Sequence, residues 1–141
     1  MKNYAEIIPE IRELSKLCKN NIIEPELYTK YEVKRGLRDL NGKGVLTGLT
    51  EISEITSSKT VNGVEMPCEG KLSYRGINVE DLVKGFISEN RFGFEETAYL
   101  LLFGNLPDKD QLNSFRNILS EYRELPEGFV KNIIMAAPSK D

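Results

Sequence analysis

The stretch FEETAYLLLFGNLP, at residues 94–107, is apolar on nearly every face of a helix. A helix of this kind must be buried on all sides, so the stretch predicts the centre of a helical core, with Leu101 in it. Glu95 and Glu96 lie near the positive end of the helix dipole, and Gly104 is placed to end the helix. The fold expected from this stretch is therefore mostly α.

Prolines and capping residues predict the helices that surround this stretch. Pro9 and Pro25 each predict the first turn of a helix, the second of which continues through Tyr31. Asn78 predicts an N-cap, with Asp81 in capping-box spacing. The helix that follows is expected to bury one apolar face, which comprises Val79, Leu82, Val83, Phe86 and Ile87.

Two more helices are expected towards the end of the chain. Asp108 predicts an N-cap, with Gln111 in the matching capping-box position, and Pro126 opens a final helix. The inner stripe of the first of these helices comprises Leu112, Phe115, Ile118, Leu119 and Tyr122. The inward residues of the second are Phe129, Val130, Ile133, Ile134 and Ala137.

Glycines and β-branched residues interrupt the helical pattern in the middle of the chain. Asn62-Gly63 is typical of a hairpin turn, and residues 45–55 and 64–74 favour extended structure. The sequence therefore predicts a small β-hairpin region near residues 45–74. The expected organisation is an N-terminal helical segment at 1–32, a glycine-rich region with short strands at 33–76 and a helical core at 77–141.

Composition restricts the classes of function. The net charge of −3 argues against nucleic acid as the main partner, and no apolar run is long enough to span a bilayer. The first residues lack the apolar stretch of a signal peptide, which suggests the cytoplasm. The 141 residues include no histidine, and the two cysteines form no CxxC pair, so no metal site and no Ser–His or Cys–His catalytic arrangement is expected.

Basic residues supply the two candidate sites. Lys34, Arg35 and Arg38, with Lys43 nearby, are either a solvated basic turn or an anion site, because arginine offers a planar fork that matches phosphate oxygens. Arg75 is expected to tie carbonyl groups at a helix end. Helix faces or caps explain the carboxylates Glu10, Glu13, Glu95, Glu96 and Asp108.

Five collinear segments from about Val33 to the chain end resemble the N-terminal part of a bacterial citrate synthase. They are VKRGLR (33–38), GVLTGLTEIS (44–53), GKLSYRGI (70–77), FEETAYLLLFGNLP (94–107) and RELP (123–126). The resemblance implies the N-terminal portion of the large domain of a multi-helical homodimer. Its activity would be the condensation of acetyl-CoA with oxaloacetate and water to give citrate and CoA, the entry to the tricarboxylic acid cycle, without a permanently bound cofactor.

The resemblance also implies where the functional residues lie. The family's catalytic aspartate and histidines match no position in this chain, so no catalytic residue is assigned and the chain alone is expected to be inactive. Arg35 matches the arginine that helps to bind the CoA phosphate. Two alternatives stay open, a 2-methylcitrate synthase that uses propionyl-CoA and a non-catalytic helical interaction module.

Overall fold

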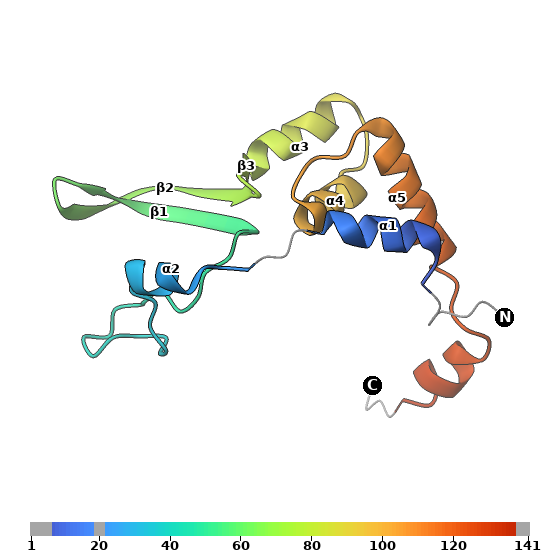
Figure 1. Cartoon of the computed structure of the whole chain (residues 1–141), viewed down its shortest axis with the longest axis horizontal. Coiled ribbons are helices and arrows are strands. Elements are labelled where there is room, and N and C mark those ends of the chain that lie inside the picture. Colours follow the sequence, from blue (N-terminus) through green and yellow to red (C-terminus); the bar gives the residue numbers. More distant parts are fainter. Residues whose placement is uncertain (1–6, 19–21, 138–141) are drawn as a thin grey trace. The chain divides into compact units, whose positions relative to one another are not determined.

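A computed structural model describes residues 7–18 and 22–137 (Figure 1). Among these residues, 7–18 and 107–137 belong to one compact unit, and 22–106 belong to another. The division into 1–32, 33–76 and 77–141 stays a prediction. In chain order, the elements are α1 (Pro9–Leu17), α2 (Pro25–Lys30), β1 (Ser53–Val61), β2 (Val64–Tyr74), β3 (Ile77–Asn78), α3 (Val79–Ser88), α4 (Phe94–Phe103), α5 (Lys109–Glu121) and the π-helix η1 (Val130–Ile134).

The fold is mostly helical, with one small antiparallel sheet in the order β1-β2-β3. Figure 1 shows β1 and β2 as two long arms and β3 as a short strand beside α3. Asn62 and Gly63 have φ angles of 50° and 78°, and Arg75 and Gly76 have φ angles of 48° and 82°. Two consecutive left-handed residues form the type I′ turn that suits a two-residue hairpin, so the predicted turn at Asn62-Gly63 is confirmed.

The predicted strand at 64–74 is confirmed, whereas the predicted strand at 45–55 is wrong, because β1 begins at Ser53. The pairing explains the difference. The turn pairs Val61 with Val64, and the register continues to Ser53 opposite Tyr74. The chain reverses directly after Tyr74, so β2 offers no further partner to residues 45–52.

Local signals predict the starts of α1, α2, α3 and α5 correctly, but the helix predicted to open at Pro126 is wrong. η1 begins only at Val130, because Gly128 adopts a left-handed φ of 76° that interrupts a helix from Pro126. α1 and α2 begin at the predicted prolines, and the Asn78 side chain caps α3 by accepting a hydrogen bond from the Glu80 amide at 2.9 Å. The capping-box role predicted for Asp81 is wrong, because Asn78 accepts from Glu80, one residue earlier, and Asp81 Oδ1 instead lies 3.9 Å from Lys84 Nζ. At α5, both bonds of the predicted Asp108 capping box are present.

The core is smaller than the apolar pattern predicts. In α4, Leu100 is fully buried, but Leu101 is half-buried and Leu102 is 51% exposed. The prediction that this helix is buried on every face is therefore wrong. In α3, Leu82 is buried, whereas Val83 and Ile87 are exposed. A small unit has too few elements to surround a helix completely.

The last two helical segments differ from each other. The predicted stripe of α5 is confirmed, because Phe115 is buried and its other members are half-buried. The residues predicted to face inward after Pro126 are exposed, apart from half-buried Phe129, since none of the described elements covers η1. Within 7–18 and 22–137, no helix combines the length and the apolar content needed to cross a membrane.

Position 93, the N-cap of α4, requires glycine because its backbone lies very close to the Phe86 ring. A Cβ on Gly93 would lie 2.4 Å from two atoms of the Phe86 ring. We expect Gly93→Ala to destabilise the chain by about 1–2 kcal/mol, the lower part of the range for overpacking, since the half-buried ring can shift. Urea unfolding measures the change.

Gly85→Ala is the matched control for this prediction. Gly85 lies inside α3, and a Cβ there would meet no atom within 4 Å. Alanine favours a helix over glycine by about 0.8–1.0 kcal/mol, so this variant should be slightly more stable than wild type. Equal effects of the two substitutions would show that the contact with Phe86 is unimportant.

Candidate functional site

The basic residues near position 35 lie on a narrow, hydrogen-bonded loop, residues 34–46, which we call the basic loop. At its base the Lys34 amide donates to the Leu46 carbonyl at 2.8 Å. Further along, Arg38 forms an antiparallel bridge with Gly44. At its tip the Asp39 amide donates to the Lys43 carbonyl at 2.9 Å, and Gly42 adopts a φ of 81°. These bonds make the loop a defined structure of its own.

The four cations of the basic loop fall into two groups. Arg38 Nη1 donates to the Gly42 carbonyl at 2.8 Å, and Lys43 Nζ lies 2.6 Å from Glu65 Oε2 on β2. Lys34 and Arg35 are exposed, and neither side chain bonds to another residue within the described ranges. Arg38 therefore stabilises the loop itself, Lys43 joins the loop to β2, and the side chains of Lys34 and Arg35 are left available to an anion.

Glu65 is the centre of a small polar network. Its Oε2 accepts from Lys43, and its Oε1 accepts from Ser58 Oγ at 2.8 Å. The hydrogen bond from Lys43, then that from Ser58, then the charge of Lys43 hold the pKa of Glu65 below its usual value. The hydrogen bond and the charge of Glu65 raise the pKa of Lys43.

These pKa shifts give the network a pH dependence with a definite sign. The stability contributed by Glu65 is present above the pKa of an unfolded glutamate and is lost as the pH falls through its lowered pKa. The stability contributed by Lys43 is present below the pKa of an unfolded lysine and is lost as the pH rises through its raised pKa. Both side chains are exposed, so water and salt screen the interaction.

Arg75, the second candidate, has the structural role predicted for it. Its Nε and Nη2 donate to the Leu101 carbonyl at 3.2 and 2.9 Å. Leu101 lies in the last turn of α4, where carbonyl groups lack partners within the helix. The guanidinium supplies this partner, and the turn between β2 and β3 holds it in place.

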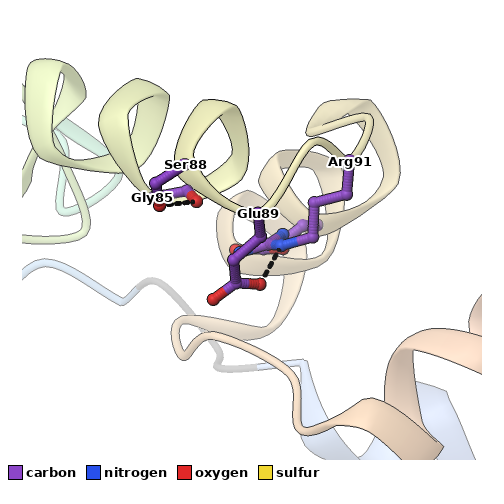
Figure 2. A network of polar contacts seen from close by, with 5 residues as sticks. Gly85, Ser88, Glu89 and Arg91 are labelled. Atoms are coloured by element: carbon purple, nitrogen blue, oxygen red, sulfur yellow. Dashed lines mark hydrogen bonds and ion pairs between the residues drawn. The ribbon is translucent and has the colours of Figure 1, made fainter.

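Glu96 was assigned to a helix face from the sequence, but the structure buries it. Glu96 is 9% exposed and forms an ion pair with Arg91, whose Nε also lies 2.6 Å from Glu89 Oε2. Figure 2 shows the Arg91–Glu89 contact beside the Ser88–Gly85 hydrogen bond at the end of α3. The chain bends between Arg91 and Glu96, so helical spacing gives no signal for their contact.

The described residues contain no recognisable catalytic constellation. A hollow of about 530 Å³ lies between α2, residues 46–54 and the Arg75-Gly76 turn, and its lining mixes aliphatic side chains with polar and charged ones, among them Glu51, Glu54 and Arg75. Elsewhere, Glu13 pairs with Lys16 at 2.6 Å and Asp108 caps α5, as expected of structural carboxylates. The basic loop is therefore the candidate site, because its exposed Lys34 and Arg35 carry the positive charge that an anion would need.

Comparison with known proteins identifies the family. The family model described as "Citrate synthase, C-terminal domain" matches residues 37–141. The chain belongs to the citrate synthase family. Arg35 lies just before the matched residues, so the match does not test its role. No solved structure matches the chain.

The relatives include two kinds of enzyme within the citrate synthase family. A 2-methylcitrate synthase of Corynebacterium glutamicum is 36% identical over 102 residues, 72% of this chain and 21% of the relative. A citrate synthase of Saccharolobus solfataricus is 36% identical over 90 residues, 64% of this chain and 21% of the relative. A 2-methylcitrate synthase of Shewanella oneidensis is 40% identical over 68 residues, 48% of this chain and 16% of the relative. The chain thus spans about a fifth of the length of the first two of these relatives.

Proposed function

We propose that this chain is part of a citrate synthase, which condenses acetyl-CoA with oxaloacetate and water to give citrate and free CoA. The observation that carries the proposal is the family match over residues 37–141. The basic loop supports it, because Lys34 and Arg35 offer exposed cations suited to the phosphate groups of CoA. A homodimer is part of the same proposal and rests on the resemblance to the family.

A 2-methylcitrate synthase that uses propionyl-CoA is the second candidate. The relatives from Corynebacterium glutamicum and Shewanella oneidensis with that name favour it. The two reactions differ by one methyl group on the acyl chain. Release of CoA thiol with acetyl-CoA and with propionyl-CoA, each in the presence of oxaloacetate, distinguishes them in the enzyme that contains this chain. Release with neither substrate would reject both candidates and favour the non-catalytic module.

The same assay applies to the 141-residue chain by itself. The chain has no histidine, the side chain that most often serves as a general acid or base near neutral pH. We therefore expect no thiol release above the uncatalysed background. Turnover would show that other groups of this chain perform the acid–base chemistry.

Arg35→Ala tests the assignment of the CoA phosphate to the basic loop. A charge-assisted hydrogen bond contributes about 1.5–3 kcal/mol, and exposure places this one at or below the low end. We expect the KM for acyl-CoA in the enzyme to rise about tenfold or less. The KM for oxaloacetate and kcat should stay nearly unchanged, because the phosphate binds alike in the ground and transition states. Added salt should reduce the difference in the KM for acyl-CoA between Arg35→Ala and the wild type.

Lys59→Ala is the control for Arg35→Ala. Lys59 is an exposed cation on β1, outside the basic loop, so its removal changes the net charge by the same amount. We expect the KM of Lys59→Ala for acyl-CoA to equal that of the wild type. A loss of kcat or an early melt in Arg35→Ala with unaltered KM would identify Arg35 as a structural residue.

A further inference from the structure

The contact between Lys43 and Glu65 joins two parts of the chain that local structure does not connect. Lys43 lies near the tip of the basic loop, whereas Glu65 lies at the start of β2, near the far turn of the hairpin. The 2.6 Å distance between Lys43 Nζ and Glu65 Oε2 therefore fastens the loop tip to the sheet.

Ser58 orients the carboxylate that makes this contact. Glu65 pairs with Thr60 across the hairpin, and Ser58 lies two residues before Thr60 on β1. Residues in this diagonal relation lie on the same face of a sheet. The bond from Ser58 Oγ to Oε1 leaves Oε2 directed to Lys43, so both carboxylate oxygens have a defined partner.

The internal bonds of the basic loop transmit this anchoring to Lys34 and Arg35. The Arg38–Gly44 bridge and the Lys34–Leu46 hydrogen bond join the two sides of the loop. A displacement of the tip therefore moves both sides together.

We infer that Glu65 is a positioning residue, which docks the basic loop on the hairpin through Lys43 and so holds Lys34 and Arg35 where the CoA phosphates bind, an inference that rests on the proposed function. Glu65 itself is an anion and repels phosphate. Its role is to fix the loop at its tip, away from Lys34 and Arg35, whose side chains have no protein partner among the described residues.

The test compares Glu65→Gln with Glu69→Gln in the enzyme that contains this chain. Both residues lie on β2, both substitutions remove one negative charge, and Glu69 forms no ion pair with another described residue. Exposed ion pairs contribute little, so we expect Glu65→Gln to raise the KM for acyl-CoA about two- to fivefold, with kcat and the KM for oxaloacetate unchanged. Glu69→Gln should leave all three values at the wild-type level.

A double variant separates positioning from a general loss of structure. If Glu65 acts through Arg35, the effect of Glu65→Gln on the KM should shrink when Arg35 is already alanine. Amide hydrogen exchange in the chain without CoA provides a second measurement. The exchange of Asp39 and Gly42, whose amides bond within the loop tip, should be faster in Glu65→Gln.

Two results would overturn the inference while leaving the proposed function intact. In both, Arg35→Ala raises the KM as expected. In the first, Glu65→Gln behaves like Glu69→Gln. In the second, Glu65→Gln lowers the KM, which would mean that Glu65 competes with phosphate for Lys43. A wild-type KM in Arg35→Ala would instead reject the CoA site, and with it the role of Glu65.

Discussion

Leu100→Ala is expected to lower the free energy of unfolding by about 2–5 kcal/mol. Leu100 is 0% exposed, so the substitution removes a completely buried side chain and leaves a cavity at the centre of α4. The whole stability of a small domain is about 5–15 kcal/mol, so this single change removes a large share of it. Urea unfolding followed by far-UV circular dichroism measures the loss.

Leu102→Ala is the matched control, since it makes the same chemical change two residues further along the same helix. Leu102 is 51% exposed. The control should cost less than about 1 kcal/mol, because half of its surface is already in contact with water. Equal losses in the two variants would show that α4 is not packed as described.

Arg91→Leu is expected to lower the free energy of unfolding by about 2–3 kcal/mol. Removal of one partner of a buried ion pair typically costs about 3–5 kcal/mol, because the other charge stays buried without compensation. The expected value is smaller here, since the Arg91 side chain is 28% exposed and water can reach it. The same unfolding experiment at neutral pH measures the effect.

The two carboxylate partners of Arg91 provide the controls. The Glu89 side chain is 66% exposed, so Glu89→Gln should change stability by less than about 1 kcal/mol. Replacement of both Arg91 and Glu96 by leucine should recover most of the loss, because neither charge then remains buried. A double variant as unstable as Arg91→Leu alone would contradict this account of Glu96.

Features that depend on a few neighbouring residues could be predicted from the sequence. The capping box of Asp108, the left-handed Gly104 at the end of α4 and the Asn62-Gly63 turn all form where expected. Each depends on the backbone preference of one or two residues and on one or two hydrogen bonds. The candidate role of Arg35 rests instead on its residue type and on the resemblance to the family, and it stays a prediction.

Features that depend on distant partners could not be predicted. The limits of β1 follow from where β2 reverses direction, and the burial of Glu96 follows from the bend that brings Arg91 to it. The contact of Lys43 with Glu65 likewise joins segments whose local patterns are unrelated. An apolar pattern indicates which side of a helix prefers burial, but the available neighbours determine how much of that side is covered, as η1 demonstrates.

The hydrogen bonds from Arg75 to the Leu101 carbonyl also bear on how the chain opens locally. An isolated helix end frays at almost no cost, independently of the rest of the molecule. Here, unwinding of the last turn of α4 would break the two hydrogen bonds from Arg75 to the Leu101 carbonyl, and separation of β3 from β2 would break the same two bonds. We therefore expect the end of the helix and the edge of the sheet to open together, so that their amide protons exchange with solvent at similar rates.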